Sequence, residues 1–125
     1  MENKLILLLL ILIIGCKKEN NQKIIMPTPP QPKEYTLIIK NSMFYEVNGV
    51  KDTAFGQTIT KHITMNQGEK IEASCYNPYN YTTITNGILT PHTGYNSTYM
   101  AVTLNNDTVS TSTCECINQI TYFYQ

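Results

Sequence analysis

The chain has 125 residues, and its 9 basic residues balance its 9 acidic residues, so the formal net charge is zero. A neutral chain whose lysines are spread out has no electrostatic basis for binding nucleic acid. Only two histidines are present, and the motifs of nucleophilic hydrolases, zinc peptidases and phosphate-binding loops are missing. The sequence therefore predicts neither an enzyme nor a cofactor.

The first residues are typical of a secretory signal. An unbroken apolar run extends from Leu5 to Ile14 and follows a short start that contains Lys4. This run is too short to span a bilayer, which needs about 20 apolar residues in a helix. It is also apolar on every face, unlike an amphipathic helix of a soluble domain. We predict that residues 1–15 are a signal peptide.

The end of the run, Ile13-Ile14-Gly15-Cys16, resembles the bacterial lipobox. In that family a small residue precedes a cysteine whose thiol is lipidated before cleavage on its amino side. The resemblance implies that Cys16 is the lipidated first residue of the mature protein, anchored to a membrane without spanning it. The residue after Cys16 is Lys17, whereas lipoproteins kept at the inner membrane carry aspartate there. In this respect the sequence resembles lipoproteins that are passed to the outer membrane. We therefore expect a lipid-anchored protein of the cell envelope, at the outer membrane.

Residues 16–33 form a linker that is first polar and then rich in proline, with Pro27, Pro29, Pro30 and Pro32 close together. Proline removes a backbone donor and fixes φ, which excludes a helix or a central strand. A polyproline II segment rises about 3.1 Å per residue, so this linker can hold a domain some tens of ångströms from a bilayer. We interpret it as a spacer. The alternative is recognition of a PxxP segment by an aromatic groove.

Residues 34–125 have the pattern of β-strands. The stretch 35–40 is rich in β-branched and aromatic residues. Asn48-Gly49 separates the predicted strands 43–47 and 50–53, and Asn86-Gly87 separates 81–85 and 88–90, as in type I′ hairpins. In the stretch 71–75, Ile71, Ala73 and Cys75 share one face. Further strands are expected at 59–65, 100–104, 108–114 and 120–124.

Seven or eight short strands and no convincing helical period predict an all-β fold, a single small antiparallel β-sandwich or a small barrel. The stretch from Ile63 to Cys75, a strand with a Gly68-Glu69 turn and then an alternating strand, is similar to the middle of many immunoglobulin-like bacterial surface domains. That resemblance implies an immunoglobulin-like sandwich over residues 34–125.

Three cysteines remain when Cys16 is lipidated: Cys75, Cys114 and Cys116. Thiols of an exported chain tend to pair. If Cys114 and Cys116 lie in one strand, both point to the same face and either can meet Cys75. We expect one disulfide from Cys75 to a member of the pair, which closes a loop of about 40 residues and stabilises the domain by a few kcal/mol.

The alternative for these cysteines is a soft-metal site for copper or zinc that combines Cys114 and Cys116 with His62, His92 or a methionine. A lone C-x-C is not a structural zinc spacing. We therefore predict no metal ligands, and we interpret His62 as a strand residue that faces solvent.

The segment 75–99 is dense in tyrosine, asparagine and threonine, a composition that makes adaptable contact surfaces. Pro78 and Pro91 interrupt it. The candidate binding residues are Tyr76, Tyr79, Tyr81, Tyr95 and Tyr99. The simpler interpretation, which we favour, is that these tyrosines are half-buried strand and loop residues of an all-β protein without tryptophan.

Two tripeptides, Asp52-Thr53-Ala54 and Asp107-Thr108-Val109, resemble the O-glycosylation acceptor of exported proteins of the Bacteroidota. Lipoproteins of that group often begin with Cys-Lys-Lys, as this chain does from Cys16. The resemblance implies that Thr53 and Thr108 carry glycans.

We therefore expect a membrane-anchored lipoprotein that is a non-enzymatic binding or structural module for a protein or glycan partner. An alternative is a small inhibitor or exclusion lipoprotein, similar to those that block lysozyme or phage receptors. A soft-metal-binding lipoprotein is a further alternative.

Overall fold

The computed structural model describes residues 24–125, so the predicted signal peptide and Cys16 lie outside the described residues. The described part has ten strands and no helix, and accordingly no helix there that is long and apolar enough to cross a membrane. The strands are β1 (Lys33–Lys40), β2 (Phe44–Val47), β3 (Val50–Thr53), β4 (Ile59–Met65), β5 (Lys70–Tyr76), β6 (Pro78–Thr85), β7 (Ile88–Tyr95), β8 (Thr98–Leu104), β9 (Asp107–Cys114) and β10 (Asn118–Phe123). The predicted all-β class is confirmed.

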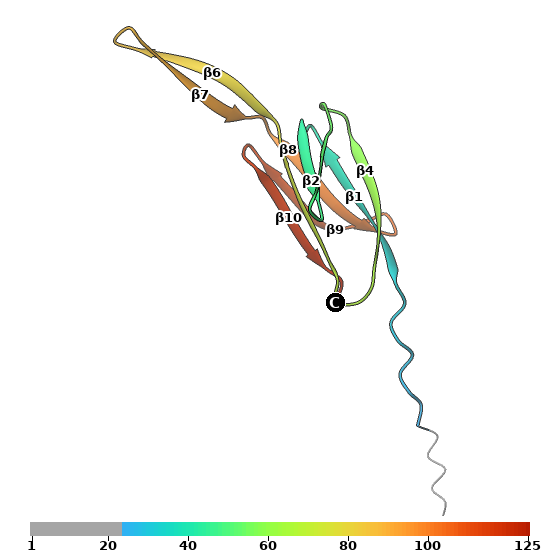
Figure 1. Ribbon diagram of the computed structural model, residues 1–125. Coiled ribbons are helices and arrows are strands. Elements are labelled where there is room, and N and C mark those ends of the chain that lie inside the picture. The colour runs from blue at the N-terminus through green and yellow to red at the C-terminus, as the bar shows by residue number, and fades with distance from the viewer. Residues whose placement is uncertain (1–23) are drawn as a thin grey trace, which may run out of the picture.

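Eight of these strands form two four-stranded antiparallel sheets, ordered β4-β1-β8-β9 and β10-β5-β2-β3. The sheets pack face to face as a sandwich, and the third sheet, β6-β7, extends away from it (Figure 1). Strands β4 and β5 are consecutive in the chain but belong to different sheets. Strand β4 pairs with β1, whereas β5 pairs with β10 and β2.

The core follows from the alternation of apolar residues along the strands. One sheet contributes Leu37 and Ile39 from β1 and Met100 and Val102 from β8, and all four are fully buried. The facing sheet contributes its own alternating set, which is Tyr45, Ile71, Ala73, Cys75 and Ile120. The predicted shared face of Ile71, Ala73 and Cys75 is thus the core face.

Both predicted Asn-Gly hairpins are present. Asn48 and Gly49 have φ angles of 48° and 82°, and Asn86 and Gly87 have 52° and 76°. Positive φ at both central residues is the geometry of a type I′ turn, which asparagine and glycine adopt most readily. The second hairpin is longer than predicted, because β6 already begins at Pro78 and β7 continues through Pro91 to Tyr95.

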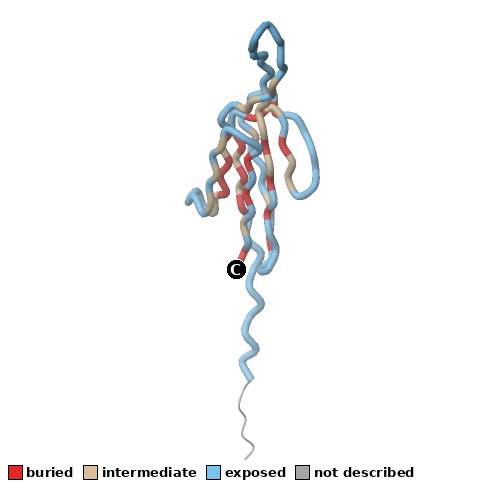
Figure 2. Tube along the Cα trace, turned by 90° about the vertical axis from the view of Figure 1, so that its left-hand side faces the viewer, coloured by how far each residue is buried: buried red, intermediate tan, exposed pale blue. Residues whose placement is uncertain are grey.

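The proline-rich linker enters the sandwich at the end far from β6-β7. There the Tyr124 hydroxyl donates a hydrogen bond of 3.1 Å to the carbonyl of Gln31, and the Lys33 ammonium lies 4.6 Å from the centre of the Tyr124 ring. The linker and the C-terminus therefore lie at one end of the domain and the β6-β7 hairpin lies at the other (Figures 1 and 2).

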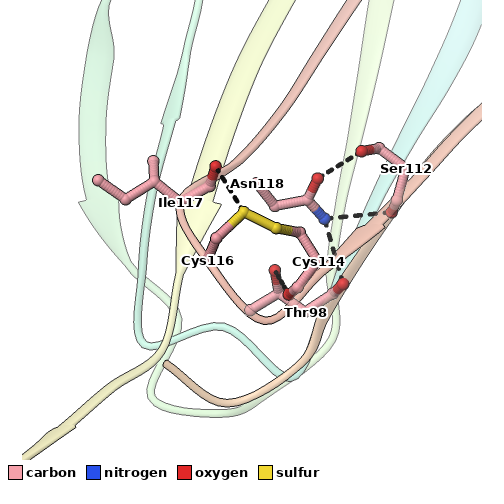
Figure 3. Close-up of a disulfide and its surroundings, with 6 residues drawn as sticks. All are labelled: Thr98, Ser112, Cys114, Cys116, Ile117 and Asn118. Atoms are coloured by element: carbon pink, nitrogen blue, oxygen red, sulfur yellow. Dashed lines mark hydrogen bonds between the residues drawn. A yellow bond between two sulfur atoms is a disulfide. The ribbon is translucent and has the colours of Figure 1, made fainter. Parts of the chain in front are cut away.

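The structure corrects the expected disulfide. Cys114 is bonded to Cys116, with Cα atoms 5.1 Å apart, and Cys75 is a free thiol (Figure 3). The expectation assumed that both members of the pair lie in one strand, but β9 ends at Cys114 and residues 115–117 bend back toward β10. Cys75 instead points from β5 into the core, where burial raises the pKa of its thiol.

The bend that carries this disulfide is supported by Asn118, a buried polar residue beside it. The Asn118 amide donates hydrogen bonds of 3.1 Å to the carbonyls of Thr98 and Ser112, and it accepts one from the Ser112 hydroxyl (Figure 3). These bonds satisfy the buried amide and hold the start of β10 against β8 and β9.

Candidate functional site: a projecting hairpin

The β6-β7 hairpin is exposed along most of its length. Its strands pair antiparallel over their full length, from Pro78 opposite Tyr95 to Thr85 opposite Ile88. Every residue from Tyr79 to Pro91 is exposed, and the hairpin stands clear of the sandwich (Figure 2). A two-stranded hairpin alone is only marginally stable in water. A binding partner that packs against such an arm would therefore stabilise it.

One face of the hairpin carries a row of rings. Tyr79 and Tyr81 follow each other along β6 with ring centres 5.9 Å apart, and the Tyr81 ring stacks on His92 of β7 at 5.1 Å. The Thr83 hydroxyl lies 2.8 Å from Nε2 of the same histidine. The row therefore presents flat aromatic surface together with polar groups that can exchange hydrogen bonds with a partner.

The tip of the hairpin is apolar. Ile84 and Leu89 lie directly opposite each other on one face, and Ile88 lies on the other face beside the turn. Their exposed fractions are 71%, 67% and 67%. Three large aliphatic side chains together on one projecting turn form an exposed apolar patch, which in soluble proteins marks an interaction site more often than a chance exposure.

The hairpin also lacks charge. No lysine, arginine, aspartate or glutamate occurs between residues 73 and 106, and His92 is the one ionisable side chain other than tyrosine and Cys75 in that stretch. Salt bridges of the described chain all lie on the sandwich, at Glu46, His62 and Lys70 and their partners. Contacts of the hairpin therefore depend on shape, apolar area and hydrogen bonds.

The five predicted tyrosines are only partly brought together. Tyr79 and Tyr81 are on the exposed arm, as the binding interpretation requires. Tyr76 and Tyr95 are half-buried at its base, where Tyr76 stacks on Phe44 at 5.3 Å and meets Tyr95 edge to face. These two tyrosines pack between the hairpin and the sandwich, and they are not part of the exposed surface of the arm. Tyr99 is on β8, with the Lys40 ammonium 5.7 Å from its ring centre.

The interpretation from sequence missed Ile84, Ile88, Leu89 and His92. The signal was present, because the Asn86-Gly87 turn is flanked by aliphatic residues on both sides within a stretch that has no charge. Aliphatic residues beside a turn are typical of the strands of a sandwich, where burial is expected. Their exposure becomes evident only when the hairpin is seen to leave the sandwich.

The other candidate residues lie on the sandwich. Thr53 ends β3 and Thr108 lies in β9, and both are exposed. The backbone N–H of Thr53 donates to Asp52 at 2.8 Å. His62 is exposed on β4, 3.6 Å from Glu34, and within residues 24–125 no three histidine, cysteine or acidic side chains gather as metal ligands would.

Comparison of the chain with protein-family models, with curated proteins and with solved structures finds no match.

Proposed function

We propose that this protein is a lipid-anchored lipoprotein of the cell envelope that binds a partner protein, without catalysis, through the β6-β7 hairpin. The observation that carries the proposal is the position of an uncharged arm with an apolar tip at the end of the domain opposite the linker. An anchor at Cys16 would place that tip on the side of the domain farthest from the membrane.

The chemistry of the arm favours a protein over a glycan. Branched aliphatic side chains such as Ile88 and Leu89 gain most by entering an apolar pocket of a partner. The row of Tyr79, Tyr81 and His92 then adds aromatic contact at low conformational cost, together with polar groups at the rim of the contact.

The anchor has its own test. In cells that export the full chain, globomycin treatment or Cys16→Ala should leave an unprocessed precursor, because lipidation of the thiol precedes cleavage. Normal cleavage under both conditions would show that the chain is not a lipoprotein of this type.

The binding proposal is tested by affinity capture from envelope extract with the full chain and two variants. Ile88→Thr/Leu89→Thr removes the apolar tip on the β7 side while keeping residues that suit a strand. Val50→Thr is the matched control, because Val50 is 69% exposed beside the other Asn-Gly turn. A partner captured saturably by the wild type and by the control, but lost by the tip variant, supports the proposal.

Equal capture by both variants would overturn it. The identity of a captured partner also separates the two functions that the sequence leaves open. A lysozyme or a porin-like receptor would make the protein an inhibitor or exclusion factor, and another envelope protein would make it an adaptor. In either case the same tip residues carry the contact.

A further inference from the structure

The hairpin has two outer edges, and neither is paired with another strand within residues 24–125. An unpaired edge presents backbone N–H and C=O groups in the spacing that another strand requires. The two edges are not equivalent, and the difference between them points to a second contact surface that is separate from the apolar tip.

The turn determines which residues face outward. Asn86-Gly87 is a two-residue turn, so the flanking pair Thr85 and Ile88 is hydrogen-bonded, and the pairs alternate from there. The non-hydrogen-bonded positions are therefore Pro78, Asn80, Thr82 and Ile84 on β6 and Leu89, Pro91, Thr93 and Tyr95 on β7. At these positions the backbone polar groups point away from the hairpin.

Proline closes one edge and leaves the other open. Pro91 is in the middle of the outward positions of β7 and has no N–H to donate, so a strand cannot form a continuous ladder there. On β6 the corresponding positions are Asn80, Thr82 and Ile84, all of which keep their donors. Pro78 stands only at the first residue of that strand.

Charge does not protect the open edge either. Exposed edges are commonly guarded by charged side chains, as on β3, which carries Lys51 and Asp52, and on β4, which carries Lys61. The hairpin has no such residue, because the chain is uncharged from 73 to 106. Two copies of β6 can therefore approach each other without like-charge repulsion.

We propose that β6 pairs antiparallel with β6 of a second copy of this chain, joining two hairpins into one four-stranded sheet. A two-fold axis at Thr82 overlaps Tyr79 to Thr85 of both copies and sets Asn80 opposite Ile84. In this register Tyr81 faces Thr83 of the second copy, and aromatic residues opposite β-branched residues are favourable cross-strand pairs. The contact is isologous and closes at two copies.

The geometry of the arm leaves room for this contact. Strand β6 runs outward from the sandwich to the tip, so antiparallel pairing places the two sandwiches at opposite ends of the shared sheet (Figure 1). The linkers then leave at the two far ends of the dimer, so two copies anchored in one membrane would lie along its surface, whereas a single anchored copy can stand upright. The apolar tip of each copy remains on the β7 side at Ile88 and Leu89, so self-association goes beyond the partner contact and does not replace it.

Cysteine cross-linking of the full chain in envelopes of producing cells tests the pairing. Thr82→Cys and Thr93→Cys are matched, because both replace an exposed threonine at an outward position on the same face, one on each edge. With a short bis-maleimide, Thr82→Cys should give a product of twice the chain mass, whereas Thr93→Cys should give no such product although the dimer still forms. The buried Cys75 thiol contributes no background.

Proline variants supply a second readout in the detergent-solubilised full chain. Thr82→Pro removes a donor from the open edge and should abolish the dimer, whereas Thr93→Pro on the closed edge should leave the dimer intact. Ile88→Thr/Leu89→Thr should also keep the dimer, so loss of the partner contact and loss of the dimer are separable.

Three results would each overturn the proposal. The first is equal cross-linking of the two cysteine variants. The second is a Thr82→Cys variant whose introduced thiol labels with a mono-maleimide but gives no dimer. The third is cross-linking of that introduced thiol to a different protein.

Discussion

The ring of Tyr79 lies across Gly94 on the neighbouring strand. A Cβ atom added to Gly94 would stand 2.5 Å from Cζ of that ring, closer than any two such atoms approach. Gly94 has an ordinary strand φ, so it is needed for space and not for backbone freedom. The glycine thus lets the first ring of the Tyr79, Tyr81 and His92 row lie flat on the hairpin.

Gly94→Ala should displace the Tyr79 ring with little loss of stability. Both residues are outside the sandwich core, so we expect the free energy of unfolding to fall by less than about 1 kcal/mol. Partner capture should weaken, because the first ring of the row no longer lies flat. Denaturant titration and affinity capture of the same variant measure the two effects.

Gly87→Ala is the comparison, because Gly87 has a φ of 76° and no side chain atom nearby. Alanine there is strained by the backbone alone, at a cost of about 1 to 2 kcal/mol in the turn. A Gly94→Ala variant that binds and stacks like the wild type would show that the position of Tyr79 is unimportant.

The sandwich core and the hairpin tip should differ sharply in their response to truncation. Leu37→Ala empties a fully buried position in β1 and should lower the free energy of unfolding by about 2 to 5 kcal/mol. Ile84→Ala at the tip, where the side chain is mostly exposed, should change it by about 0.5 kcal/mol or less. Comparable losses in denaturant titrations would mean that the tip is packed against the domain.

Cys75 should be unreactive in the folded protein. Its side chain is fully buried, and burial raises the pKa of the thiol, an effect that hydrogen bonds from Thr98 and Ser42 only partly oppose. Maleimide labelling of the native chain, kept free of reductant, should be absent and should appear on denaturation. Mass spectrometry of the labelled peptide distinguishes Cys75 from Cys114 and Cys116, and rapid labelling of native Cys75 would contradict its placement on the core face.

Tyr35 should contribute to stability at neutral pH and lose that contribution in alkali. Burial raises the pKa of Tyr35 to about 12, above the value of about 10 in an unfolded chain, and a smaller part of this rise comes from the interaction with Tyr122. The folded state therefore holds this proton more tightly, so the contribution is complete below pH 10 and is lost as the pH rises toward 12. Tyr35→Phe should flatten the loss of stability over that window.

The matched control for this pH dependence is Tyr79→Phe, which removes an exposed hydroxyl on the hairpin. Comparison of the two variants separates the effect of the buried Tyr35 hydroxyl from the effect of removing a tyrosine hydroxyl as such. If the profile of unfolding free energy against pH is the same for Tyr35→Phe as for the wild type, the Tyr35 hydroxyl is not buried as the structure places it.

The strand pattern was predictable because local rules determine most of it. Alternating Ile71, Ala73 and Cys75 identified the core face of β5, and both Asn-Gly pairs identified hairpins. Ten strands are present where seven or eight were expected, and which strands share a sheet was not predictable. Sheet membership depends on long-range pairing such as β1 with β8, and no local pattern encodes it.

The candidate site was predicted in composition and missed in geometry. Tyrosines near residue 80 indicated a contact surface. Pro91 was expected to interrupt this stretch, but it lies inside β7, because it occupies an outward position where no backbone donor is required.

The expected disulfide was also wrong because a local pattern was taken to continue too far. The pairing of Cys75 with Cys114 or Cys116 assumed that Cys114 and Cys116 lie in one straight strand. The chain bends after Cys114, and this bend brings Cys114 and Cys116 together as a disulfide.

Whether the hairpin tip contacts a partner protein can be measured with a photo-cross-linking side chain at position 89 of the full chain, in its own envelope. The same side chain at position 50 is the control. Leu89 and Val50 are similarly exposed beside equivalent turns, one on the projecting arm and one on the sandwich. We predict a discrete adduct with a different protein from position 89 and none from position 50. Adducts from position 50 alone, or from neither position, would contradict the proposed function.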